Sequence, residues 1–250
     1  MYQTKRLMIT WLIIFSVSNL NAADILHIAQ FSQATSKDIT PLNWEELTFN
    51  KIENHTIYRL VKDDDAMVIK ATTNQSASGL IRKTQFDLKT YPIIEWRWKI
   101  NNIYVKGNVR KKSGDDYPAR IYITFQYNPK NSGFIEKMKF NAAKLLYGEY
   151  PPVASINYIW ESKTPVGTIV PNPYINKVMM FVVDSGNEKL GQWVKHTRNV
   201  YDDYMEAFGT VPPLVSGVAI MSDSDNTKES AVAYYGDITF RKGTKHGLSR

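Results

Sequence analysis

Apolar and polar residues alternate along many short segments of this chain, and turn residues separate the segments. Every second residue is apolar in Ile94–Ile100, and the same spacing recurs in Arg120–Tyr127. This period places alternate side chains on opposite faces of a strand. It predicts an all-β fold, a two-sheet antiparallel β-sandwich. The predicted strands are Ile57–Val61, Met67–Thr72, Ser78–Asp87, Ile93–Ile100, Arg120–Tyr127, Ser155–Glu161, Lys177–Asp184, Trp193–Asn199, Ser216–Ser222 and Ala231–Phe240.

Two short helical insertions are expected within the sandwich. Apolar residues recur at helical spacing over Phe134–Tyr147, and a second helix is predicted over Val200–Phe208, between Asn199 as its cap and Gly209. The apolar stripe of the first helix is expected to pack on the sandwich. Its lysines leave open the alternative that it lies on a membrane surface. These lysines are Lys137, Lys139 and Lys144.

The N-terminus has the pattern of a signal peptide over residues 1–23. Lys5 and Arg6 precede the apolar run Leu7–Val17, and small residues that suit cleavage follow up to Ala23. The apolar run is about half of the roughly 20 residues that a spanning helix needs. We therefore expect a periplasmic or secreted protein with no integral membrane span after cleavage.

Charge and cysteine content narrow the class of protein further. There is no cysteine, so disulfides and thiolate catalysis are excluded. Of the formal net charge of +7, six positive charges lie in the predicted signal or after Phe240. The remaining body carries about +1, which predicts no nucleic-acid partner. We expect one β-sandwich domain over residues 24–240, and a basic disordered tail over 241–250.

Several segments resemble a known family. They are EWRWKI (Glu95–Ile100), GDDYPARIYITF (Gly114–Phe125), INYIW (Ile156–Trp160), DDYMEAFG (Asp202–Gly209), SDSDNT (Ser222–Thr227) and AYYGDITF (Ala233–Phe240). Together they resemble the bacterial exported family catalogued as domain of unknown function 3047. The resemblance spans about Phe49 to Phe240 and implies no activity. The pattern also looks like a jelly-roll of the concanavalin or lectin kind, and fold alone does not determine function.

Polar side chains of the predicted strands indicate a ligand-binding surface. By parity, Arg97, Arg120 and Tyr122 point away from the core, and Asp115 and Asp116 lie on a turn that enters the Arg120 strand. Charged, aromatic and hydrogen-bonding groups on one outer face suit a glycan, with Arg120 offering forked hydrogen bonds. The alternative is that these aspartates only organise the turn and pair with an arginine.

A cation site is predicted near the C-terminus. Asp223 and Asp225 offer oxygen ligands at alternate positions, as in the start of a calcium loop, and Asp237 on the last strand could complete the site. The rest of an EF-hand pattern is missing. The alternative is a hydrogen-bonded hairpin turn between two strands.

These observations favour a non-catalytic protein that binds a polysaccharide or glycan in the cell envelope, with calcium as a candidate cofactor. A second hypothesis is a polysaccharide hydrolase or lyase that uses Asp115 or Asp116 with His196 or Glu95. No predicted strand presents two or more acidic residues on one face, as several jelly-roll glycanases do, and this argues against the second hypothesis. A third hypothesis is a structural or protein-partner module of the envelope.

Overall fold

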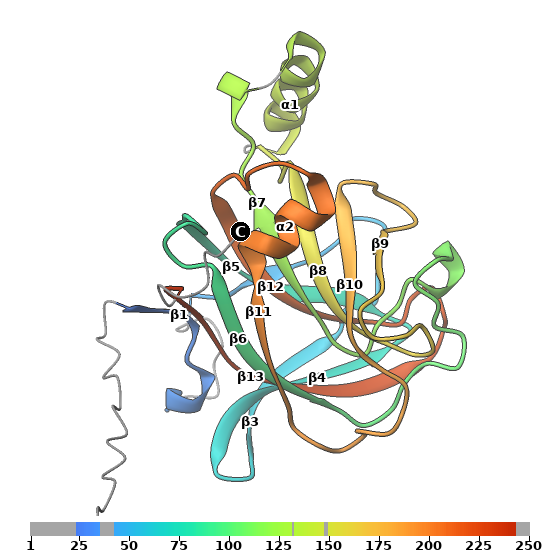
Figure 1. The fold of residues 1–250 in the computed structure, drawn as a ribbon. Helices are drawn as coiled ribbons and strands as arrows, with labels where there is room; N and C mark the ends of the chain where they lie inside the picture. Colours follow the sequence, from blue (N-terminus) through green and yellow to red (C-terminus); the bar gives the residue numbers. More distant parts are fainter. Residues whose placement is uncertain (1–23, 36–42, 132, 148–149, 244–250) are drawn as a thin grey trace, which may run out of the picture.

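The computed structural model describes residues 24–35, 43–131, 133–147 and 150–243, which form two facing β-sheets (Figure 1). The predicted signal peptide, residues 1–23, and most of the predicted tail, residues 244–250, lie outside the described residues. The first residues of that tail are structured, because the last strand runs to Arg241 and the backbone N–H of Lys242 donates to the carbonyl of Asp24 at 3.0 Å.

The first sheet, sheet A, has the strand order β11-β6-β13-β4-β3, with β1 paired to β13. All of its strand pairs are antiparallel. Its strands are β1 (Ile25–Ala29), β3 (Ile57–Asp63), β4 (Ala66–Asn74), β6 (Ile93–Ile100), β11 (Val194–Asn199) and β13 (Ser230–Arg241).

The second sheet, sheet B, has the order β2-β5-β12-β7-β8-β10-β9. It departs from the expected antiparallel pattern at one pair, since β8 and β10 run parallel. Its strands are β2 (Glu45–Leu47), β5 (Ala77–Phe86), β7 (Arg120–Phe125), β8 (Ala154–Glu161), β9 (Ile169–Pro171), β10 (Val178–Ser185) and β12 (Val215–Asp223). All ten predicted strands are confirmed. The sequence pattern missed β1, β2 and β9.

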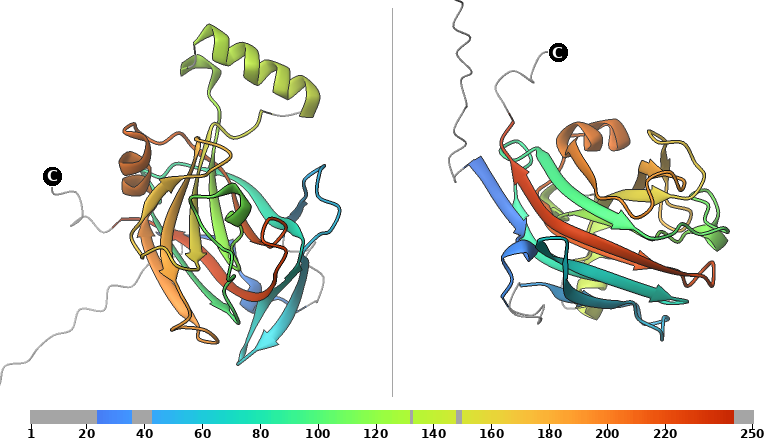
Figure 2. Two further views of the ribbon diagram at one scale, coloured as in Figure 1. Left: turned by 90° about the vertical axis from the view of Figure 1, so that its right-hand side faces the viewer. Right: turned by 90° about the horizontal axis from the view of Figure 1, so that it is seen from below.

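The main core lies between the sheets, where the predicted strand parity is confirmed. Trp96 and Trp98 on β6 are buried, and they face the buried residues Ile121 and Ile123 on β7. Figure 2 shows the two layers from the side and from below. Large apolar side chains between two sheets supply most of the stabilisation of such a fold.

A smaller second core lies on the outer face of sheet B. The segment between β6 and β7 crosses this face and packs Val109 and Tyr117 against Ile159, Met180 and Val182. This segment contains the short 3-10 helix η4 (Lys112–Gly114). Gly114 packs against the backbone of Asn108 so closely that a Cβ on Gly114 would lie 2.7 Å from the amide nitrogen of Asn108. The covering segment buries part of a sheet face that a sandwich commonly leaves exposed.

Both predicted helices are confirmed, as α1 (Phe134–Tyr147) and α2 (Val200–Phe208). The Asn199 side chain caps α2 by accepting from the amides of Tyr201 and Asp202, and Gly209 ends it with a φ of 67°. The expectation that α1 packs its apolar stripe on the sandwich is wrong. Figure 2 shows α1 standing away from both sheets. None of the described helices is long and apolar enough to cross a membrane.

The connection between β12 and β13 also differs from expectation. The predicted hairpin turn at Asp223–Thr227 is wrong, because β12 belongs to sheet B and β13 to sheet A. The connection therefore crosses from one sheet to the other. This crossing brings the aspartates of the turn to the end of the sandwich where β7 begins.

Candidate functional site

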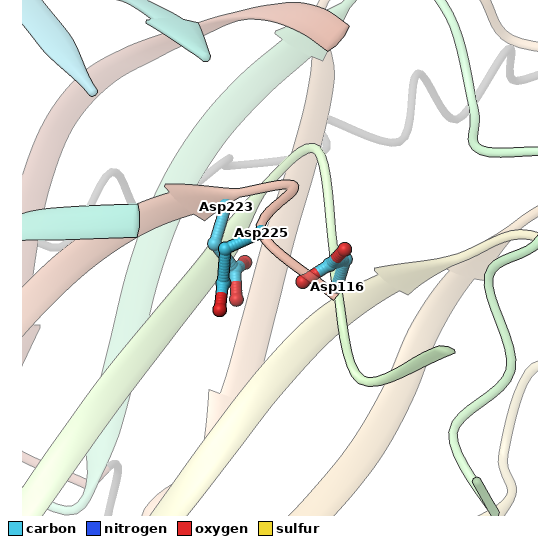
Figure 3. Close-up of side chains that lie close together, drawn as sticks. All are labelled: Asp116, Asp223 and Asp225. Atoms are coloured by element: carbon cyan, nitrogen blue, oxygen red, sulfur yellow. The ribbon is translucent and has the colours of Figure 1, made fainter. Parts of the chain in front are cut away.

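An acidic cluster forms where the segment before β7 meets the end of β12. These strands are antiparallel neighbours with Arg120 opposite Met221, so residues before Arg120 and residues after Met221 share one end of sheet B. Figure 3 shows Asp116, Asp223 and Asp225 lying together there. One carboxylate oxygen from each lies within 4.8 Å of the others. Two of the three aspartates that the sequence predicted as cation ligands therefore belong to one cluster, which Asp116 completes.

Asp116 holds the turn after β12 in place. Its Oδ1 accepts from the backbone amide of Asn226 at 3.3 Å and from the Asn226 side-chain amide at 3.0 Å. Its Oδ2 accepts from the backbone amide of Thr227 at 2.5 Å. The side chain is only 1% exposed. A buried carboxylate with three donors is well oriented for further electrostatic contacts.

Asp223 and Arg120 form a buried ion pair beside Asp116. Arg120 donates through Nη2 to Asp223, and the backbone amide of Tyr117 donates to the other Asp223 oxygen at 3.2 Å. The Arg120 guanidinium lies between the rings of Tyr117 and Tyr122, at 5.2 and 5.3 Å from their centroids. Burial raises the pKa of Asp223 well above its usual value; Arg120 opposes this shift, and the charges of Asp116 and Asp115 reinforce it.

Asp115 lies one residue before Asp116 and faces another part of the chain. Its oxygens accept from the Tyr117 hydroxyl at 3.0 Å and from the side-chain amide of Asn172 at 2.8 Å. Burial raises its pKa, while Arg120 and these two hydrogen bonds oppose the rise. Asp115 thus joins the 115–120 segment to the loop after β9.

Tyr122 stands further along β7 on the same outer face of sheet B and is half-buried. Burial raises its pKa to about 12, and the positive charge of Arg120 opposes the rise. The structure therefore brings six of the eight predicted site residues to one region: Asp115, Asp116, Arg120, Tyr122, Asp223 and Asp225.

In this region, acidic side chains outnumber the ion pairs that they form among the described residues. Among the described residues, none of Asp115, Asp116 and Asp225 forms an ion pair, and Arg120 pairs with Asp223. Burial raises the pKa of the half-buried Asp225, and the charge of Asp116 adds to the shift. Buried carboxylates without matching cations are costly unless they bind a metal ion or a proton.

Two buried hydroxyls that have no hydrogen-bond partner among the described residues adjoin the cluster. They are the Tyr104 hydroxyl and Thr227 Oγ1, on side chains that are 0% and 2% exposed. The backbone amide of Thr227 is bonded to Asp116, and the charges of Asp223 and Asp116 add to the effect of burial in raising the pKa of Tyr104. Carboxylate and neutral oxygens are the ligands that Ca²⁺ takes. The residues present therefore fit a hard divalent cation.

An exposed aromatic ring is joined to the cluster. The Tyr174 hydroxyl donates to Asn226 Oδ1 at 2.8 Å, and Lys112 Nζ lies 5.2 Å from the centre of the Tyr174 ring. Tyr174 is 52% exposed. Sequence reasoning missed Tyr104, Asn172 and Tyr174, because only the packing of the 101–119 segment and of the loop after β9 brings them to the site.

Arg97 and Asp237 lie elsewhere, so the predicted set does not form one surface. Arg97 is on the outer face of sheet A, where its guanidinium lies 4.5 Å from the centre of the Trp193 ring and its stem crosses Gly236. Asp237 accepts from the Ser32 amide at 2.9 Å and from the Ser32 hydroxyl at 2.5 Å. The sequence pattern gave Arg97 the outward parity and placed Asp237 on the last strand, and it could not show which sheet carries each residue.

The two acid–base partners named for a hydrolase are also apart from Asp115 and Asp116. Glu95 pairs with Arg241 on the outer face of sheet A. His196 lies at the edge between the sheets, with Nε2 2.6 Å from Asp184 Oδ2 and its ring stacked 4.8 Å from that of Trp96. The carboxyl pair geometry of a glycosidase is therefore not formed by these residues.

Comparison with known proteins identifies a family. The model of a protein family of unknown function, DUF3047, matches residues 42–239, and no curated protein matches the sequence. A family 12 xyloglucanase from Bacillus licheniformis is 10% identical with a TM-score of 0.44, over 88% of this chain and 98% of its own. The Emp47p carbohydrate recognition domain is 12% identical with a TM-score of 0.44, over 90% and 100%.

The Endo-D glycoside hydrolase domain from Streptococcus pneumoniae is 9% identical, with a TM-score of 0.31 over 81% of this chain. The chain spans 22% of the length of that protein.

Proposed function

We propose that this chain, which belongs to the DUF3047 family of proteins of unknown function, is a non-catalytic glycan-binding β-sandwich whose binding rim is ordered by a divalent cation. Asp116, Asp223 and Asp225 hold the cation, for which calcium is the candidate because all the ligands are oxygens. The N-terminal pattern supports a periplasmic or secreted location, where free calcium is available to such a site.

One observation carries the proposal: a chain of hydrogen bonds joins the carboxylates to an exposed aromatic ring. Asp116 accepts from the Asn226 side-chain amide, and Asn226 in turn accepts from the Tyr174 hydroxyl. A cation that fixes Asp116 therefore also fixes the position of Tyr174. Pre-organised contacts of this kind strengthen binding because less freedom is lost when the ligand arrives.

The chemistry around Tyr174 suits a sugar. The exposed ring offers a flat apolar face to the C–H groups of a pyranose. Lys112 Nζ, 5.2 Å from the ring centre, can donate to sugar hydroxyls, and the half-buried Asp225 can accept from them. Apolar contact with a few placed polar groups is the usual composition of a small-molecule site.

The contacts of Asp115 and Asp116 support a role other than acid–base catalysis. Both carboxylates are buried, and their oxygens already accept hydrogen bonds from Tyr117, Asn172, Asn226 and the backbone of Thr227. A general acid or base must reach the substrate at hydrogen-bond distance. Side chains occupied in this way hold the rim and do not meet a substrate.

The proposal is tested on immobilised polysaccharides, with the chain from Asp24 onward. Retained protein and released reducing ends are measured in calcium and in chelator. We expect retention on a defined glycan in calcium, at least tenfold less in chelator, and no release of reducing ends. Released ends would overturn the non-catalytic role. No retention on any glycan would favour a structural or protein-partner role.

Variants of Tyr174 separate the contribution of its ring to glycan binding from the contribution of the cation. Tyr174→Ala is expected to abolish retention while the protein still gains thermal stability from calcium. Tyr174→Phe keeps the ring and loses the hydrogen bonds of the hydroxyl to Asn226 and to the Lys112 carbonyl, so it should retain part of the binding. Asp65→Asn, at an exposed turn aspartate outside the cluster, is the matched control and should bind like the unaltered protein.

A polysaccharide hydrolase is the second candidate, favoured by a cavity at the edge of the sandwich. This cavity has a volume of about 390 Å³ and is lined by His196, Arg198 and Glu206 among others. Asp184 orients His196, as a carboxylate orients a catalytic imidazole. If the protein releases reducing ends, His196→Gln should lower the rate at least a hundredfold while Asp116→Asn leaves it unchanged.

A further inference from the structure

Helix α1 and its flanking turn η5 (Pro129–Asn131) form a projection between β7 and β8 (Figures 1 and 2). The helix is attached through one side. The Phe140 ring stacks on Tyr127 with centroids 3.7 Å apart and an interplanar angle of 5°. Asn141 Oδ1 accepts from the Tyr150 hydroxyl at 2.9 Å. These contacts fix which side of the helix faces the sandwich.

The apolar side of α1 faces solvent. Phe134, Ile135, Met138 and Leu145 are 78%, 71%, 58% and 89% exposed. At about 3.6 residues per turn, these four positions fall within roughly 100° of arc, on a side different from Phe140. Four large apolar side chains on one exposed stripe are unusual for a soluble protein surface and indicate an interaction.

Positive charge borders this stripe. Lys137 lies on one edge of the apolar arc and Lys139 on the other, and Lys130 precedes the helix; Glu136 is the acidic residue in the first turn. An apolar stripe between lysines is the pattern of a helix that lies in a membrane interface. A second copy of α1 on this stripe would bring like charges together, whereas anionic headgroups would match them.

We propose that α1 docks the protein on the surface of an anionic lipid bilayer, with the apolar stripe among the acyl chains and the lysines at the headgroups. The geometry leaves the acidic cluster free. Strand β7 begins at Arg120, in the cluster, and ends at Phe125, before α1. The docking helix and the cluster therefore lie beyond opposite ends of β7, and those two ends are about 17 Å apart at roughly 3.3 Å per residue.

Vesicle sedimentation tests this inference with the chain that starts at Asp24, which holds every described strand and lacks the apolar segment of the predicted signal. Vesicles of phosphatidylcholine mixed with phosphatidylglycerol are compared with vesicles of phosphatidylcholine alone. We expect binding to the mixed vesicles at least tenfold tighter, and weakened by salt. Equal or absent binding to the two kinds of vesicle would overturn the inference.

Two variants of the same chain, from Asp24 to Arg250, separate the contribution of α1 from that of the basic C-terminal residues, whose positive charge would also favour anionic lipids. Ile135→Ser combined with Leu145→Ser is expected to weaken vesicle binding at least tenfold without lowering the unfolding temperature, because both side chains are exposed. Lys245→Gln combined with Arg250→Gln should bind nearly as well as the unaltered protein. The reverse order of effects would overturn the inference.

Oligomeric state in solution gives an independent check. The unaltered protein is expected to be monomeric by sedimentation velocity. A dimer that dissociates in the Ile135→Ser and Leu145→Ser variant would assign the stripe to a second copy of the chain and contradict docking on lipid.

Discussion

Asp184 and Asp223 are equally buried aspartates with opposite electrostatic surroundings. Their side chains are 1% and 2% exposed. Asp184, on the inner face at the edge of sheet B, accepts from the indole N–H of Trp98 at 2.8 Å and contacts Lys189 at 2.9 Å and His196 at 2.6 Å. Burial opposes its ionisation, yet His196 and these other donors hold the pKa of Asp184 below its usual value.

Asp223 has one cationic partner and lies among other carboxylates. Its pKa is raised by burial, which the Arg120 charge does not offset. The difference shows that burial alone does not decide whether an acid is structural: the charges of the neighbours do. The negative charge of Asp184 is matched by its cationic neighbours. The negative charge around Asp223 is matched only when a cation or a proton is added.

The largest effect on stability is expected from the loss of the Asp184 carboxylate. Asp184→Asn removes a buried charge that faces Lys189 and His196, and it should destabilise the protein by about 3 kcal/mol. Urea unfolding measures this, with Asp65→Asn as a control that should stay within about 0.5 kcal/mol of the unaltered protein. Equal effects of the two substitutions would remove the contrast between Asp184 and an exposed aspartate.

The pH dependence of stability should differ between calcium and chelator. The raised pKa values of Asp115, Asp223 and Asp225 mean that the folded protein binds protons more readily than the unfolded chain. In chelator, stability should therefore rise as pH falls from 7 toward about 5. In calcium this rise should be absent, because the cation keeps the carboxylates ionised.

Asp184 gives the opposite trend at lower pH. Its lowered pKa stabilises the folded state above the ordinary aspartate value of 3.8, and this contribution is lost as pH falls below that value. Thermal unfolding scans at a series of pH values, in chelator, would show stability first rising and then falling as pH is lowered. A steady fall in stability from pH 7 downward, in chelator, would contradict the assignment of excess negative charge to the cluster.

A smaller effect is expected at the rim of the cluster. Asp225 is half-buried and repelled by Asp116, so Asp225→Asn should stabilise the calcium-free protein by up to about 1 kcal/mol. The same variant should lose the stabilisation that calcium gives to the unaltered protein. If the variant is less stable in chelator and still responds to calcium, Asp225 is not a ligand.

The smallest effect on stability is expected at Tyr104. Within the part of the chain that the structure describes, its buried hydroxyl has no hydrogen-bond partner, so Tyr104→Phe should change stability in chelator by less than about 0.5 kcal/mol. The affinity of this variant for calcium should fall about tenfold if the hydroxyl is a ligand. Tyr127→Phe is a matched control, since the Tyr127 hydroxyl is also buried with no partner among the described residues and lies beside α1.

Much of the fold followed from the sequence, because period-two patterning reports the face of each side chain. The pattern does not report which strands are neighbours. Arg97 and Arg120 have the same outward parity, and the structure places them on different sheets. The structure therefore brings together the predicted residues that are close in the chain and share parity, Asp115, Asp116, Arg120 and Tyr122, and it separates Arg97 from them.

Contacts between distant segments could not be predicted. Asp184 and His196 meet across the two sheets, although each alone resembles an ordinary strand residue. The exposed stripe of α1 was predicted as a packing surface because an apolar stripe usually docks on the body of a protein. The stacking of Phe140 on Tyr127 and the hydrogen bond from Tyr150 to Asn141 show which side of the helix is attached.

The most direct test of the central claim is a calorimetric titration of calcium into protein that has been treated with chelator and dialysed. We expect one saturable binding event, absent in Asp225→Asn, preserved in Asp65→Asn, and accompanied by a rise in the unfolding temperature. No saturable binding, or binding that Asp225→Asn leaves unchanged, would contradict the account of the acidic cluster as a cation site that orders the rim.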